Sequence, residues 1–178
     1  MVAEASSNAA VSRIHMVMLA ASVLLIIAAL STDVFVGSGA GNASVTSTLW
    51  RLQSCSNQSC STLMLPDPTC TTLANYQRSA QAFGLASLFT SLGSLLTVVF
   101  SATQHTQIIA LIISIVMLGI EASVLAAMHH SGSFSCAAEN YASNMLQFSA
   151  SMALFVCSFV NQLIAGFMLW GFNRLKRS

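Results

Sequence analysis

Charged residues are scarce in this chain of 178 residues. Lysine, arginine, aspartate and glutamate together make up 6% of it, and hydrophobic residues make up 55%. An average soluble domain carries about 25% charged residues, because charges keep a folded surface in contact with water. So few charges cannot cover a water-exposed surface. The composition therefore excludes an ordinary soluble domain and indicates an integral membrane protein.

A strong charge of either sign is also missing, and so are the common catalytic motifs. The formal net charge is +1, which provides no basic field for binding nucleic acid. We find no nucleophile elbow, phosphate-binding loop, paired carboxylates or metal-binding helix motif in the sequence. We therefore expect no enzymatic activity, no cofactor, no catalytic or metal site and no nucleic-acid partner.

Long apolar stretches are what the chain does contain. A helix needs about 20 mostly apolar residues to cross the hydrocarbon core of a bilayer. Four segments meet this requirement, at 14–31, 80–100, 108–128 and 146–170. They predict a single integral membrane domain over 1–178, an all-α transmembrane four-helix bundle in the lipid bilayer, with external loops at 32–79 and 129–145. A cleaved signal peptide is the alternative for the first segment, but its apolar run exceeds the usual length of about 7–15 residues.

The basic residues predict how the bundle is oriented. Arg13 precedes the first span, and Arg174, Lys176 and Arg177 follow the last. Because basic residues accumulate on the cytoplasmic side, both termini are expected there. Two glycosylation sequons, at Asn42 and Asn57, then fall on the predicted outside.

Four of the five cysteines lie in the predicted external loops. An oxidising compartment favours disulfides over a zinc site, and the long loop has no histidine cluster to complete such a site. Four cysteines allow three pairings, and the sequence does not choose among them. Cys157 lies inside the last span and is interpreted as a packing residue. The disulfide candidates are therefore Cys55, Cys60, Cys70 and Cys136.

The first external loop is too long to be a simple connection. Residues 43–52 are rich in valine, threonine, leucine and tryptophan and partly alternate in polarity, while Pro66-Asp67-Pro68 indicates a turn. We predict a small disulfide-stapled extracellular β-sheet. Because such a sheet has little core of its own, it should rest on the helix ends.

Small side chains recur every three or four residues along the second span, which puts them on one helix face and favours close packing over a pore lining. They are Ala80, Gly84, Ser87, Ser91 and Ser94. In the last span, Asn161 and Gln162 are interpreted as interhelical hydrogen-bonding residues before ligands.

Glu121 is an acidic residue at membrane depth, where an ionised and unpaired carboxylate is costly. Arg78, at the entrance of the second span, is long enough to reach toward it. We therefore hypothesise an intramembrane ion pair between Arg78 and Glu121, with a proton or cation site as the alternative. His105, His129 and His130, at helix edges, are interpreted as solvated before metal-binding.

Three short sequence motifs lie at the ends of the first two predicted spans and in the loop between them. They are Ser31-Thr32-Asp33-Val34-Phe35 at the end of the first span, Thr48-Leu49-Trp50 with Gln53 and Cys55 in the loop, and Arg78-Ser79-Ala80-Gln81-Ala82-Phe83 at the start of the second span. Together they resemble the amastins, trypanosomatid surface glycoproteins distantly related to claudins. Arg51 stands where the amastin loop signature has glycine. The resemblance implies a claudin-like four-helix bundle topped by a small external sheet, at the plasma membrane.

These observations lead to a first functional hypothesis and two alternatives. We expect a non-enzymatic cell-surface tetraspan glycoprotein that acts in adhesion, membrane organisation or host–parasite interaction through its external loop. Leu49 and Trp50 are expected to form the core of that loop, with an anchoring role as the simpler interpretation. The alternatives are a channel or transporter using Glu121, Asn161 and Gln162, and an auxiliary subunit of a larger membrane complex. Partners left open are further copies of the chain and other membrane proteins.

Overall fold

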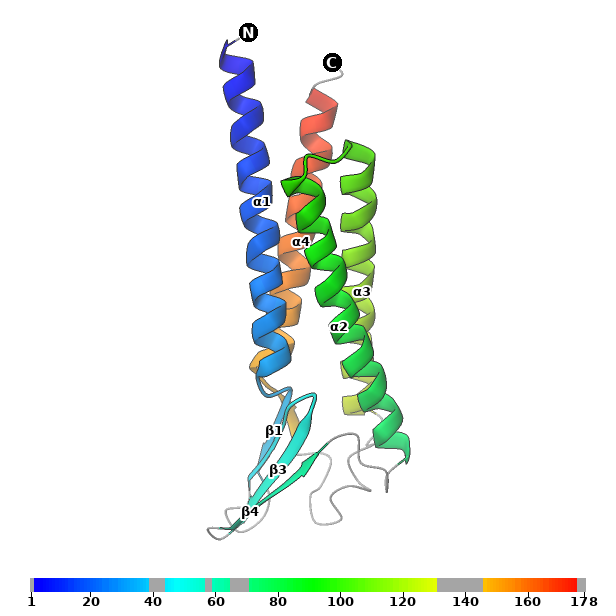
Figure 1. The fold of residues 1–178 in the computed structure, drawn as a ribbon. Helices are drawn as coiled ribbons and strands as arrows, with labels where there is room; N and C mark the ends of the chain where they lie inside the picture. The colour runs from blue at the N-terminus through cyan, green and yellow to red at the C-terminus, as the bar shows by residue number, and fades with distance from the viewer. Residues whose placement is uncertain (1, 39–43, 57–58, 65–70, 131–145, 176–178) are drawn as a thin grey trace.

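Four long helices form a bundle, and a small sheet covers one of its ends (Figure 1). The computed structural model describes residues 2–38, 44–56, 59–64, 71–130 and 146–175. Within these residues the helices are α1 (Val2–Ser31), α2 (Thr71–Val99), α3 (Gln104–His130) and α4 (Ala150–Leu175). Each contains a stretch that is long and apolar enough to cross a membrane, which confirms the prediction of four spans.

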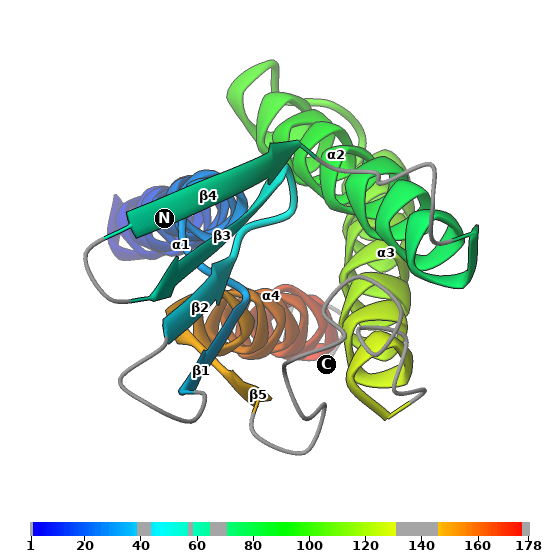
Figure 2. The same ribbon diagram turned by 90° about the horizontal axis from the view of Figure 1, so that it is seen from below.

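The helices are arranged as a ring in which each contacts the next along the chain and α4 returns to α1 (Figure 2). Both termini and the turn between α2 and α3 lie at one end, here called the terminal end (Figure 1). The sheet lies at the opposite end, here called the sheet end. Exposed side chains on the outside of the ring are largely aliphatic or aromatic, as is appropriate for contact with lipid, and they include Val17, Leu24, Phe89 and Phe167.

Among the described residues the sheet has five antiparallel strands in the order β4-β3-β2-β1-β5. Four of them come from the long loop, which confirms the predicted sheet. These are β1 (Phe35–Ser38), β2 (Ser44–Ser47), β3 (Arg51–Ser56) and β4 (Ser59–Met64). The segment 43–52, partly alternating in polarity, contains β2, a tight turn and the start of β3.

The fifth strand, β5 (Leu146–Phe148), comes from the segment that hydropathy placed in the last span. It pairs with β1, with Phe148 opposite Phe35, and α4 begins only at Ala150. The helical stretch that is long and apolar enough to cross a membrane is therefore Ala150–Gly171, whereas the sequence predicted a span at 146–170. Hydropathy alone cannot separate a buried apolar strand from the first turn of a helix.

One hydrophobic core joins the sheet to the bundle. Its buried members come from all four helices and from the sheet, and they include Ile26, Phe35, Val45, Leu49, Leu125 and Phe155. A smaller cluster of Leu19, Leu111 and Ala165 fills the terminal half of the bundle. The sheet is therefore seated on the helix ends, as its small size requires.

The turn between α2 and α3 contains a strained residue. Ser101 has a φ angle of 52°, in the left-handed region that residues with a Cβ atom rarely adopt. It follows the last turn of α2, where its N–H donates to the carbonyl oxygen of Val98 (3.1 Å). This is the position after a helix at which glycine is most common.

We expect Ser101→Gly to raise the free energy of unfolding by about 0.5–1 kcal/mol, because glycine adopts this conformation without strain. Ser101→Ala, which keeps the Cβ atom, should give no gain. Thermal unfolding of the detergent-solubilised protein, followed by circular dichroism, measures both variants. Equal unfolding temperatures for the two variants would contradict the prediction.

Candidate functional site

The side chain of Thr48 stabilises the turn between β2 and β3. The Thr48 hydroxyl oxygen accepts hydrogen bonds from the backbone N–H groups of Trp50 (3.1 Å) and Arg51 (3.0 Å). The Thr48 N–H in turn donates to the Arg51 carbonyl (2.9 Å). A threonine at the first position of a turn commonly serves its backbone in this way. The first residue of the loop signature therefore shapes the turn.

Leu49 and Trp50 connect this turn to the helices through hydrogen bonds. The Trp50 indole N–H donates to the carbonyl oxygen of Leu30 (3.1 Å), in the last turn of α1. The Gln81 side-chain amide on α2 donates to the carbonyl oxygen of Leu49 (2.8 Å), and the Leu49 side chain is buried in the core. The last carbonyls of a helix have no partner within it, so the Trp50 bond satisfies one of them. We call residues 48–51 the docking turn.

A second attachment involves α1, β5 and α4. The Ser151 hydroxyl donates to the carbonyl oxygen of Ala29 (2.7 Å), and the Ser149 N–H donates to the Val34 carbonyl (2.9 Å). The His129 ring stacks on Phe148, with ring centroids 4.6 Å apart, and lies 6.0 Å from the Phe35 ring. The ring of His129, expected to be solvated, therefore takes part in aromatic packing.

The docking turn can be tested with two threonines of the same hairpin. Replacing Thr48 by valine keeps the shape but removes the acceptor of two solvent-exposed backbone hydrogen bonds, so we expect a loss of about 0.5–1.5 kcal/mol in unfolding free energy. Thr46→Val is the matched control, because within the described residues the Thr46 hydroxyl makes no hydrogen bond. Urea or thermal unfolding measures both. A Thr48→Val variant as stable as Thr46→Val would rule out this role.

The outer hairpin, formed by β3 and β4, extends away from the bundle (Figure 1). Cys55 lies opposite Cys60 in the register, and a disulfide joins them. The other cysteine candidates, Cys70 and Cys136, lie outside the described residues, as do the sequon residues Asn42 and Asn57. Side chains from Ser59 to Thr62 are exposed, and Met64 is 73% exposed. The hairpin therefore presents an uncharged surface beyond the docking turn.

In the membrane region, three helices meet through a closed ring of hydrogen bonds. Gln162 Nε2 donates to Ser91 Oγ (2.8 Å), the Ser91 and Ser114 hydroxyls bond to each other (2.7 Å), and Ser114 donates to Gln162 Oε1 (2.7 Å). All three residues are buried. Each polar group of the ring has a partner, so the ring ties α2, α3 and α4 together at little desolvation cost.

A second polar contact joins α1 to α4. The Asn161 amide N–H donates to the Met18 carbonyl (2.7 Å) and to the Ser22 hydroxyl (2.8 Å), and the Ser158 hydroxyl donates to the Ser22 carbonyl (3.2 Å). Asn161 and Gln162 are thus interhelical hydrogen-bonding residues, as the sequence indicated. The small residues of α2 are likewise buried, Gly84 among them.

Glu121 lies buried beneath the docking turn. Within the described residues neither of its carboxyl oxygens has a hydrogen-bond partner. A Cβ atom built on Gly84 would lie 3.5 Å from both Glu121 Oε1 and Leu49 Cδ1. The carboxyl group is therefore next to the helix contact and the docking turn, in an apolar surrounding.

The ion pair hypothesised between Arg78 and Glu121 is not formed among the residues that the structure describes. Arg78 is exposed, whereas Gly84 packs near Glu121. Six residues separate Arg78 from Gly84, and at 3.6 residues per turn this places them about 120° apart around α2. The Arg78 side chain is long enough to reach toward Glu121, but it lies on a different face of α2 from the one that packs near Glu121.

Sequence reasoning missed β5, Ser151 and the bond from Trp50 to Leu30. A serine two residues into a helix and a tryptophan in a loop have many uses, and only the tertiary arrangement identifies their acceptors.

The chain is also similar to one known protein family. A family model described as "Amastin surface glycoprotein" matches residues 19–169, from within α1 almost to the end of α4, and no curated protein matches the chain.

Proposed function

Because this chain belongs to the amastin surface glycoprotein family, we propose that it is a non-enzymatic surface protein of the plasma membrane that acts through its sheet. Its role in this proposal is adhesion, membrane organisation or contact between parasite and host. The termini are cytoplasmic, and the sheet end is extracellular. The basic residues Arg13, Arg174, Lys176 and Arg177 near the chain ends support this orientation.

The observation that carries the proposal is the way the sheet is attached. The docking turn is bonded to α1 through Trp50 and to α2 through Gln81, while β5 leads directly into α4. Three of the four helices therefore position one sheet. Such a platform is expected to present a contact surface in a fixed orientation relative to the membrane, which suits binding to a partner better than it suits chemistry.

The outer hairpin is the part of the sheet best placed for contact. Its disulfide closes the two strands near their connection, and the exposed side chains of β4 are serine, cysteine, threonine and methionine. A strand at the edge of a sheet, without charged residues to protect it, is a common site for pairing with another chain. A further copy of this protein or another membrane protein could occupy it.

A cell-mixing experiment tests the proposal. Cells that express the tagged protein are mixed with cells that do not, and its distribution is imaged. We expect enrichment where two expressing cells touch. A Cys55→Ser/Cys60→Ser variant should lose this enrichment at an unchanged surface level, because the hairpin is no longer crosslinked. Uniform staining of wild-type cells would contradict homotypic adhesion, and stable co-purification with one membrane protein would favour an auxiliary role.

A channel or transporter is less well supported. The polar path expected for it consists of Glu121, Asn161 and Gln162, but the two amides are engaged in hydrogen bonds between helices. Glu121 is then left without a polar neighbour along that path among the described residues. Proton flux into liposomes containing the purified protein, abolished by Glu121→Gln, would reverse this preference.

A further inference from the structure

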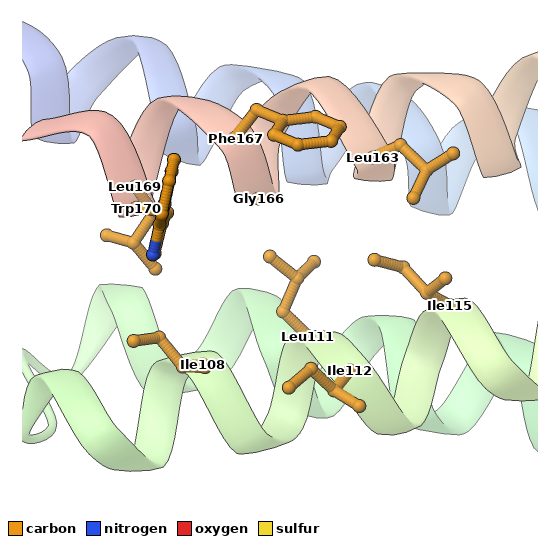
Figure 3. Close-up of a pocket in the computed structure, with 9 residues that line it drawn as sticks. All are labelled: Ile108, Leu111, Ile112, Ile115, Leu163, Gly166, Phe167, Leu169 and Trp170. Carbon is orange, nitrogen blue, oxygen red and sulfur yellow. The ribbon is translucent and has the colours of Figure 1, made fainter.

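A groove opens between α3 and α4 in the terminal half of the bundle (Figure 3). Its volume is about 370 Å³, and every one of its lining residues is aliphatic, aromatic or glycine. From α3 the lining includes Ile108, Ile112 and Ile115, and from α4 it includes Gly166, Phe167 and Trp170. Figure 3 shows Leu111 and Ile115 of α3 and Trp170 of α4 extending into the space between the two helices.

A glycine of α4 contributes to the space between α3 and α4. Near the middle of the groove, Gly166 has no side chain to fill the space, and a Cβ atom there would lie 3.3 Å from Leu111 Cδ2. A larger residue at position 166 would therefore project into the groove or displace Leu111.

The position of the groove determines the kind of occupant. It lies within the apolar spans of both helices, Gln104–His130 and Ala150–Gly171. Phe167 is 69% exposed and Ile112 is 55% exposed, so the rim faces the lipid. Because the lining side chains are apolar apart from the indole nitrogen of Trp170, the space favours hydrocarbon, which gains dispersion contacts with them. A lipid acyl chain meets this requirement.

The sequence that follows the groove is basic and selects among lipids. Arg174, Lys176 and Arg177 follow Trp170 within seven residues, and the sequence contains no aspartate or glutamate after Glu139. The stretch from 79 to 120, which includes the turn from α2 to α3, also has no acidic residue. Basic residues at a membrane surface attract anionic headgroups. We propose that the groove between α3 and α4 binds an acyl chain of an anionic phospholipid from the leaflet at the terminal end.

Trp170 provides the measurement, because it lines the groove. The full-length protein is placed in nanodiscs with increasing fractions of phosphatidylserine or phosphatidylcholine that carry brominated chains, which quench tryptophan fluorescence on contact. The Trp170→Phe variant supplies the background from Trp50. We expect half-maximal quenching of Trp170 at about a fivefold lower fraction of phosphatidylserine than of phosphatidylcholine, the ratio that corresponds to one basic residue contributing about 1 kcal/mol.

Two glycines of α4 form the matched pair of variants. Gly166→Leu should abolish the preference for phosphatidylserine, whereas Gly171→Leu, where a Cβ atom would meet nothing within 4 Å, should keep it. If Gly166→Leu fails to fold, Ile112→Phe in the groove and Ile109→Phe, which does not line it, provide a second pair on α3. Replacing Arg174, Lys176 and Arg177 by glutamine should remove the preference but leave quenching by phosphatidylcholine.

Three outcomes overturn the proposal. Equal quenching by the two lipids in the wild type means that no anionic lipid is selected. A preference that persists in Gly166→Leu means that the basic residues attract lipid without the groove. Efficient disulfide crosslinking of Phe167→Cys between two copies in nanodiscs means that a helix of a second copy occupies the groove.

Discussion

Replacing Glu121 by methionine is expected to raise the free energy of unfolding by about 2–3 kcal/mol. The wild-type carboxyl group is fully buried, and within the described residues it has no hydrogen-bond partner. Burying an unsatisfied polar group costs about 1–3 kcal/mol, and a charge inside the membrane costs at least as much. Methionine has a similar shape without that cost, so it should pack beside Gly84 as Glu121 does. Denaturant titration of the detergent-solubilised protein measures the change.

A double-mutant cycle with Arg78 supplies the control for this prediction. Because Arg78 is exposed on another side of α2, Arg78→Met should change stability by less than about 0.5 kcal/mol. The two substitutions should also be additive, as expected for residues that do not interact. If both single variants are destabilised and the cycle gives a coupling above about 1 kcal/mol, the two residues form the ion pair after all.

Replacing Gly84 by leucine is expected to lower the free energy of unfolding by about 3 kcal/mol. A Cβ atom at this position would lie 2.9 Å from Leu30 Cδ2, so that methyl group must shift, and it would lie 3.5 Å from both Leu49 Cδ1 and Glu121 Oε1, which leaves little room for the rest of a leucine side chain. Overpacking of a filled core costs about 1–3 kcal/mol and sometimes more. The damage should reach the docking turn, since Leu49 belongs to it. A fluorescence change at Trp50 should therefore accompany the loss of stability.

Gly93 lies on the same helix and is the matched control. A Cβ atom there would meet nothing within 4 Å. Gly93→Leu should therefore leave stability unchanged or raise it by about 0.5–1 kcal/mol, because leucine favours a helix over glycine. Thermal unfolding of both variants in the same detergent decides the matter. Equal losses of unfolding free energy in Gly84→Leu and Gly93→Leu would mean that α2 is sensitive to leucine at either glycine. The contact with Leu30 would then not be the cause.

If both predictions hold, the region beneath the docking turn combines a tight contact with a destabilising group. Gly84 allows α1, α2 and the docking turn to approach, and Glu121 lies in the same place without a polar partner. Natural proteins keep such costly groups where they serve a purpose, although the purpose need not be stability. Measuring surface contacts of cells expressing Glu121→Met would show whether this group contributes to the proposed function.

Local sequence patterns were enough to predict several features. Hydropathy indicated the four spans because crossing a bilayer requires about 20 apolar residues in a row, whatever their neighbours. Asn161 and Gln162 were expected to join helices because an amide inside a membrane needs a partner. The sheet followed from a loop too long and too rich in β-forming residues to be a connection. These are properties of single segments, and each can be recognised without the others.

Other features depend on which segments meet, and only the tertiary structure decided them. The pairing of Cys55 with Cys60 depends on the register of β3 and β4, and β5 is defined by its pairing with β1, in which Phe148 lies opposite Phe35. Arg78 is separated from Glu121 by its angle around α2, which matters only once the facing helix is known. The groove between α3 and α4 likewise depends on how two helices pack. The sequence by itself determined the elements and their membrane setting, because burial of apolar segments is a local requirement, whereas the partner of each polar group was determined by packing between distant segments.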